Sequence, residues 1–131
     1  MMNLLLFVQL LAVAVMPAKT ADGKAKITFT EHTIKLGDVY PGERYERVFT
    51  FKNTGSAPLV INDIETSCGC TVVKYSKEPI LPGKEGEVRV DFIPKENYGF
   101  TSKSFIVSSN AENDTEYLYL QATIKLKPRK N

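Results

Sequence analysis

The stretch Glu87-Val88-Arg89-Val90-Asp91-Phe92 alternates charged and apolar residues without interruption. Successive side chains of a β-strand point to opposite faces of a sheet, so this period of two predicts a strand. Val88, Val90 and Phe92 would then face a core, while the three charged residues face water. The stretch predicts half-buried β-structure, and no window of the chain past residue 25 shows a sustained helical period.

The same period of two recurs along the rest of the chain, with turn residues such as Pro41-Gly42 and Pro82-Gly83 between the runs. The predicted strands cover residues 26–30, 33–39, 44–53, 58–65, 70–75, 86–93, 102–109 and 116–126. About seven or eight short strands in roughly 105 residues predict an all-β fold, an immunoglobulin-like antiparallel β-sandwich. The connections are too short for parallel crossovers through helices.

Packing alone must hold this sandwich together, because the chain has no Trp and its two cysteines are only one residue apart. Antibody-type domains instead use a disulfide between the sheets and a core Trp. The alternation predicts a core formed by Phe49, Phe51, Val88, Val90, Phe92, Leu118, Leu120 and Ile124.

The amino-terminal residues indicate export. The run from Leu4 to Met16 is apolar except for Gln9, and no charged side chain precedes Lys19. Such a run is shorter than the about 20 residues that span a bilayer, but it is typical of a secretory signal peptide. We expect residues 1–21 to be a signal peptide or an uncleaved anchor, 22–126 the sandwich and 127–131 a polar tail. A secreted or periplasmic location follows, with no membrane span after leader removal.

The charges argue against several classes of function. The chain has 17 basic and 15 acidic residues, and they are interspersed, so it lacks the basic field expected of a nucleic-acid binder. Its glycines are scattered, no nucleophile elbow is present, and the single histidine, His32, is expected to be a surface residue. We therefore predict no catalytic residue, no cofactor and no enzymatic activity, with thiol–disulfide exchange as the one exception.

That exception concerns Cys68 and Cys70 in the stretch Ser67-Cys68-Gly69-Cys70-Thr71. Two thiols at this spacing can be small core side chains, a disulfide helped by a bend at Gly69, or soft ligands for Cu(I). A bridge closing about three residues contributes only roughly 1.6 kcal/mol in the chain-entropy model. A structural staple is thus a weak explanation, and redox exchange is better motivated. The usual redox motif has two residues between its cysteines at a helix start, which this chain lacks.

Tyr117 and Tyr119 are expected to point outward, because they alternate with Leu118 and Leu120. They fit two interpretations: cross-strand aromatic pairs that stabilise a sheet, and an aromatic patch for a partner.

An ordered set of motifs carries a family resemblance: Asn53-Thr54-Gly55, Pro58-Leu59, Ser67-Cys68-Gly69-Cys70-Thr71, Pro82-Gly83. With them the chain resembles a family of domains of unknown function, common in secreted proteins of Bacteroidetes-like bacteria. That family looks like a branch of the immunoglobulin-like sandwiches that include major sperm protein and Hydin-type (ASH) domains. The resemblance covers about residues 28–126 and implies a fold and secretion, but no activity. We therefore expect a non-enzymatic module that binds an envelope or secreted protein, or is structural. The alternative is a thiol redox or Cu(I)-handling protein that uses Cys68 and Cys70.

Overall fold

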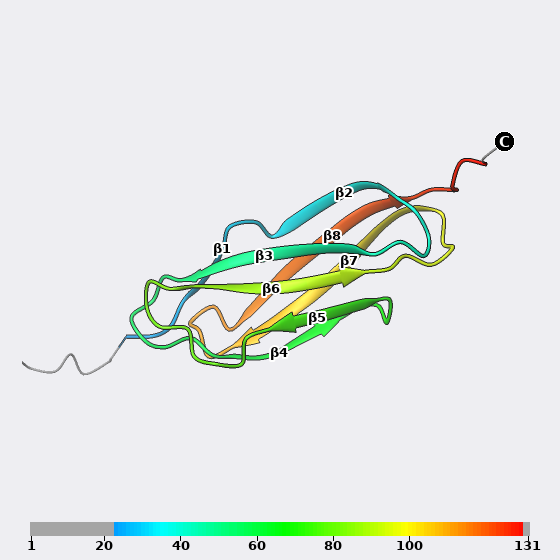
Figure 1. The fold of residues 1–131 in the computed structure, drawn as a ribbon. Coiled ribbons are helices and arrows are strands. Elements are labelled where there is room, and N and C mark those ends of the chain that lie inside the picture. Colours follow the sequence, from blue (N-terminus) through cyan, green and yellow to red (C-terminus); the bar gives the residue numbers. More distant parts are fainter. Residues whose placement is uncertain (1–22, 130–131) are drawn as a thin grey trace, which may run out of the picture.

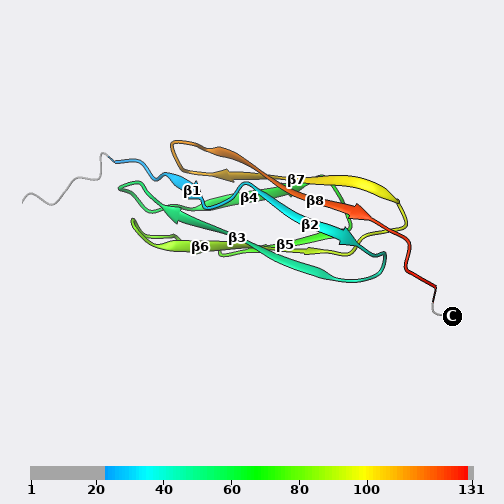
Figure 2. The same cartoon turned by 90° about the horizontal axis from the view of Figure 1, so that it is seen from above.

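The computed structural model describes residues 23–129 as a sandwich of two four-stranded sheets (Figure 1). The first sheet has the order β1-β3-β6-β5 and the second the order β2-β8-β7-β4. The strands are β1 (Ile27–Phe29), β2 (Thr33–Val39), β3 (Tyr45–Asn53), β4 (Ile61–Thr66), β5 (Thr71–Tyr75), β6 (Glu85–Phe92), β7 (Gly99–Ser109) and β8 (Thr115–Ile124). Seen from above, β3 and β6 lie in one layer and β7 and β8 in the other (Figure 2). Nowhere in residues 23–129 is there a helix with the length and apolar character needed to cross a membrane.

The predicted fold class is confirmed, and each predicted strand has a counterpart in the structure. The boundaries differ most at two places. β7 begins at Gly99, three residues early, because Gly99 to Thr101 continue the ladder with the end of β8. β4 begins at Ile61, three residues late, since Leu59 instead forms an isolated bridge with Ile80. The predicted signal peptide and the last two residues of the predicted tail lie outside the described residues.

One strand pair departs from the antiparallel expectation. Five of the six strand pairs are antiparallel, but β2 runs parallel to β8, with Thr33 opposite Tyr119 and Val39 opposite Ile124. The argument from short connections applies to consecutive strands. β2 and β8 are the second and the last strand in the sequence. Strands β3 to β7 connect them, so no crossover helix is needed. The chain enters in the first sheet as β1 and changes to the second sheet before β2.

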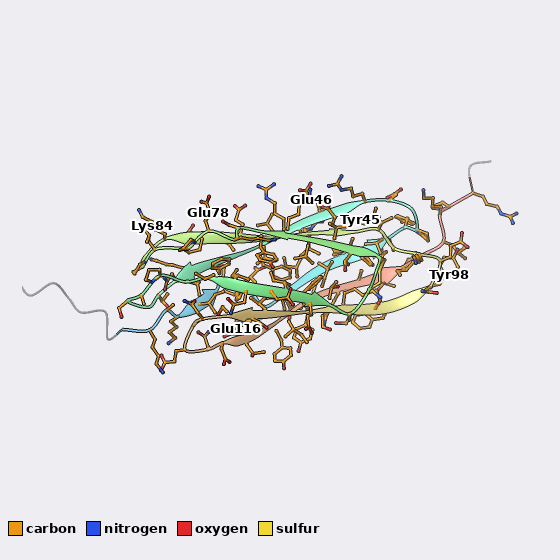
Figure 3. All side chains as sticks on the ribbon, turned by 90° about the horizontal axis from the view of Figure 1, so that it is seen from below. Tyr45, Glu46, Glu78, Lys84, Tyr98 and Glu116 are labelled. Atoms are coloured by element: carbon orange, nitrogen blue, oxygen red, sulfur yellow. A yellow bond between two sulfur atoms is a disulfide. The ribbon has the colours of Figure 1, made fainter. Side chains whose placement is uncertain are left out.

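The predicted core is confirmed residue by residue. All eight side chains that the alternation assigned to it are 0–4% exposed, and they come from both sheets. Side chains fill the space between the two layers (Figure 3). Phe49 and Phe105 bring the sheets together, with ring centroids 6.2 Å apart.

A buried amide organises one end of the sandwich. Asn53 is 0% exposed, and its Nδ2 donates to the carbonyl oxygens of Ala57 and Ile80, both at 2.8 Å. The N–H of Gly55 donates to its Oδ1 at 3.0 Å. These bonds satisfy partly buried backbone groups where β3 turns toward β4. We call this end, with turns 54–60 and 76–84, the Asn53 end.

The opposite end carries the turn in which the cysteines lie. Turns 40–44, 67–70 and 93–98 meet there, where β4 leaves the second sheet and β5 enters the first. Figure 3 shows Tyr98 at this end and Lys84 at the other. We call it the cysteine end.

Candidate functional site

The cysteine pair lies in the turn between β4 and β5 and forms a disulfide. The Cα atoms of Cys68 and Cys70 are 5.3 Å apart, within the range that a disulfide can bridge. A straight strand would hold residues i and i+2 near the upper limit of that range, so the turn brings them closer. Both side chains are half-buried, and Cys70 packs against the core.

The turn does not depend on a glycine-only backbone conformation. We expected Gly69 to permit a bend that other residues resist, but it is not among the glycines with positive φ. Gly69 is exposed, and a Cβ added to it would meet nothing within 4 Å. Neither backbone strain nor packing therefore requires glycine at the tip of this turn.

Hydrogen bonds hold the turn independently of the sulfur bridge. The hydroxyl groups of Thr66 and Thr71 are 2.7 Å apart across it, and Thr71 also donates to the carbonyl oxygen of Cys68 at 2.9 Å. The Ser104 N–H donates to the Ser67 hydroxyl at 3.1 Å, which ties the turn to β7. The disulfide is thus one of several constraints on this segment.

Two lysines lie beside the disulfide. Lys95 and Lys103 line a cavity of about 50 Å³ together with both cysteines, and Phe92 forms part of its apolar wall. Within residues 23–129 neither lysine forms an ion pair. A cavity of this size admits only a few atoms, since one water occupies about 30 Å³. It is far smaller than a cofactor pocket.

A backbone donor also points at one sulfur. The N–H of Cys70 donates to the Sγ of Cys68 at 3.2 Å. A negative charge on that sulfur would therefore meet a donor already in place, in a cavity that two lysines help to line. The redox and Cu(I) roles remain predictions, and binding of Cu(I) requires the pair to be reduced first, because the thiolate is the metal-binding form.

The sequence indicated only part of this site. Lys103 shares its strand face with Phe105 and Val107, so alternation alone places a cation on the inward side of β7. The alternation of β7 is therefore a sequence signal for this lysine. Lys95 lies in the 93–98 loop, and only the tertiary fold brings it to the cysteines.

A second candidate site is the outer face of the second sheet. Its two central strands, β7 and β8, present ten outward side chains, and none of them carries a charge: Phe100, Ser102, Ser104, Ile106, Ser108, Thr115, Tyr117, Tyr119, Gln121 and Thr123. We call this the uncharged face. Tyr117 is 50% exposed, Tyr119 37% and Phe100 71%, which confirms the outward direction predicted for the tyrosines. Phe100 was missed, because the predicted strand began at residue 102.

A hollow borders the uncharged face beside β2. Its volume is about 250 Å³, and Lys35, Gly37, Phe100 and Gln121 are among its lining residues. It lies at a bulge in β2, where Gly37 has a φ of 74° that disfavours a side chain. The missing side chain leaves this part of the face open.

His32 lies at the surface, as expected. Its Nε2 is 3.3 Å from a carboxylate oxygen of Glu116, and 52% of its side chain is exposed. Its ring and that of Phe29 pack in an edge-to-face arrangement, with centroids 5.7 Å apart. No group of three or more metal-binding side chains occurs in the part of the chain that the structure describes.

The fold defines the chain as an immunoglobulin-like β-sandwich with a short-range disulfide at one end. The protein belongs to the family described as protein of unknown function (DUF1573), whose model matches residues 27–124. A search of curated proteins finds no match to this sequence.

Solved structures share the fold at low identity. A protein of unknown function from Porphyromonas gingivalis W83 has a TM-score of 0.70 and 18% identity, covering 82% of this chain and 50% of that one. The ASH/PapD-like domain 7 of human CEP192 has a TM-score of 0.66 and 12% identity, covering 80% and 89%. The E. coli chaperone DraB has a TM-score of 0.56 and 11% identity, covering 75% and 54%. The chain thus spans only half of the P. gingivalis protein.

Proposed function

We propose that the protein is a non-enzymatic, secreted or periplasmic module that binds another protein on its uncharged face. The observation that carries this proposal is the absence of charge from ten outward side chains on β7 and β8, where Phe100, Tyr117 and Tyr119 are exposed. Exposed aromatic side chains without competing charges are typical of the centre of a protein interface.

The character of this face limits what it binds. A charged group buried against the centre of this face would find no partner of opposite sign among the outward side chains of β7 and β8 and would lose its hydration, while charged side chains such as Lys35 and Glu65 lie only on the flanking strands. The favoured partner is therefore a protein whose contact surface is also apolar and uncharged. Tyrosines supply large contact areas and a hydroxyl that hydrogen-bonds at the edge. The fold neighbour DraB is a chaperone, which is consistent with protein binding by this type of sandwich.

A site-specific cross-linking experiment tests the docking face. A photo-reactive phenylalanine analogue replaces Tyr119 in the full chain in its native cell, and Thr50, which points outward from the first sheet, is the matched control position. We expect a cross-linked protein from position 119 that is weak or missing from position 50. Equal cross-linking from the two positions would contradict the proposal.

The same partner gives a quantitative test. Replacing Tyr117 and Tyr119 by serine should weaken its binding about 30-fold or more, as expected when an interface centre loses about 2 kcal/mol. Folding should be unchanged, because both side chains are outward-facing and exposed. The control variant is Thr50→Ser. Unchanged affinity in the double variant would exclude this face.

The location is proposed from the apolar run of residues 4–16. Fusing residues 1–24 to a reporter that is active only after export should give an active reporter. A fusion in which Leu5 and Leu11 are replaced by arginine should be inactive. An active arginine fusion would show that this segment does not direct export.

A further inference from the structure

We propose that the disulfide between Cys68 and Cys70 exchanges with a dithiol of another protein, with Cys70 as the sulfur attacked and Cys68 as the leaving thiolate. The proposal does not depend on the uncharged face, which lies on β7 and β8. It rests on the chemistry that surrounds the two sulfurs at the cysteine end.

A structural role does not account for the pair. The bridge closes so short a loop that it constrains the unfolded chain little, by roughly 1.6 kcal/mol. The hydroxyl pair of Thr66 and Thr71 and the bonds to Ser104 already hold the same turn. The pair thus adds little to a turn that is otherwise secured.

Cations beside the sulfurs favour thiolate chemistry. Lys103 is on the inward side of β7, in register with the buried Leu120, and Lys95 reaches the same cavity from the 93–98 loop. A lysine at an inward-facing position is uncommon unless it is paired, and within residues 23–129 this one forms no ion pair. Both ammonium groups attract an incoming thiolate and stabilise the one that leaves.

The hydrogen bond from the Cys70 N–H at 3.2 Å assigns the leaving group to Cys68. A thiolate formed on Cys68 keeps this donor, and charge-assisted hydrogen bonds are stronger than neutral ones. The better-stabilised thiolate leaves faster in thiol–disulfide exchange.

The tip of the turn is open to a protein partner. Gly69 is exposed and has no atom near the position that a side chain would take. Because neither its backbone conformation nor packing requires glycine, the missing side chain serves the approach of another chain.

The exchange has two balanced steps. A thiolate of the partner bonds to the Sγ of Cys70, the sulfur–sulfur bond breaks, and its electron pair leaves on the Sγ of Cys68. The partner's second thiolate then attacks its own sulfur in the mixed disulfide and displaces Cys70 as a thiolate. The partner dithiol loses two protons and two electrons and becomes a disulfide, and the cysteine pair is reduced.

Reduction kinetics of the oxidised full chain test the role of the lysines. Dithiothreitol is the dithiol probe, and glutathione and a synthetic Cys-x-x-Cys peptide distinguish small thiols from protein dithiols. Lys95→Met and Lys103→Met should each slow reduction about threefold, because a thiolate that loses a neighbouring cation leaves more slowly. The control is Lys84→Met at the Asn53 end. If Lys103→Met and Lys84→Met react at the same rate, or millimolar dithiothreitol leaves the folded pair oxidised, the proposal is overturned.

The assignment of the sulfurs has its own test. Wild-type protein is acid-quenched during reduction by glutathione, and the adduct is mapped by peptide mass spectrometry. We expect glutathione on Cys70, and equal or greater labelling of Cys68 would overturn the assignment. Circular dichroism of each variant confirms that the compared proteins are folded.

Discussion

The turn that leads into β4 and the turn that leads out of it are held in different ways. Into β4, the amide of Asn53 makes four hydrogen bonds to backbone groups and is fully buried. Out of β4, a covalent bond joins Cys68 to Cys70 at a half-buried, open position. The buried amide is needed for the fold, because removing it leaves backbone groups without partners. The disulfide constrains only three residues, so the fold depends little on it and the bond can take part in thiol–disulfide exchange.

The largest expected effect concerns the core that both turns cover. Phe51 lies on the same strand face as Asn53, and Phe92 borders the cavity of the disulfide. Replacing either by alanine should cost about 3–5 kcal/mol, because each ring is fully buried. Chemical denaturation measures the free energy of unfolding of both variants. Phe100→Ala is the exposed control, and its free energy of unfolding should lie within about 0.5 kcal/mol of the wild-type value. A loss below about 1 kcal/mol at Phe92 alone would show that the cysteine end does not share the core of the Asn53 end.

The next effect tests the amide itself. Asn53→Ala should cost about 2–4 kcal/mol, since it leaves the carbonyl oxygen of Ala57 and the N–H groups of Gly55 and Lys26 without their partner. The Ile80 carbonyl oxygen keeps only its bond from the Leu59 N–H. Asn110→Ala is the matched control: Asn110 also bonds backbone groups across a turn, but it is exposed. Water can replace its bonds, so we expect about 1 kcal/mol or less there. Equal losses of stability in Asn53→Ala and Asn110→Ala would show that burial of the amide does not determine its contribution.

Strand alternation predicted much of the fold because each strand has one buried face. It placed Phe49 and Phe51 in the core and turned Tyr119 outward, and the structure confirms all three. The same rule puts Asn53 on the inward face of β3 and Lys103 on that of β7, so a polar side chain at an inward position is itself a signal in the sequence. These two residues distinguish the ends of the sandwich: Asn53 lies at the Asn53 end and Lys103 at the cysteine end.

Other features depend on contacts between distant parts of the chain. The parallel pairing of β2 with β8 joins strands at opposite ends of the sandwich sequence, and no local pattern encodes it. The approach of Lys95 to the cysteines likewise needs the assembled cysteine end. Local periodicity therefore predicts which face of a strand is buried, whereas pairing and the composition of the site follow from the tertiary fold.

A smaller effect is expected when the disulfide is removed. Replacing Cys68 and Cys70 together by serine should leave a folded domain that loses at most about 1.6 kcal/mol. The threonine and serine hydrogen bonds of the turn remain in place. Thermal unfolding of both proteins, with and without reductant, measures the difference. A double variant that does not fold would show that the fold requires the disulfide turn, as we expect only for the turn held by Asn53.

The smallest expected effect is an alkaline pH dependence at the cysteine end. The Tyr45 hydroxyl accepts from the Tyr40 N–H and donates to Glu43, both at 2.9 Å. Burial, reinforced by the Glu43 carboxylate, raises the pKa of Tyr45 above its ordinary value of 10.0. The folded state therefore favours the neutral phenol. This contribution is complete below pH 10 and is lost as the pH rises through the folded pKa, because the unfolded chain ionises first.

Tyr45→Phe separates this effect from the titration of other groups. Melting temperatures of the wild type and the variant, measured from pH 8 to pH 11, should differ least at the alkaline end, because only the wild type loses a contribution there. The hydroxyl lies near the surface, so the change should be small and confined to that range. If the two proteins keep a constant difference across the whole range, ionisation of Tyr45 is not linked to folding, and the phenol acts only through its hydrogen bonds in the 40–45 turn.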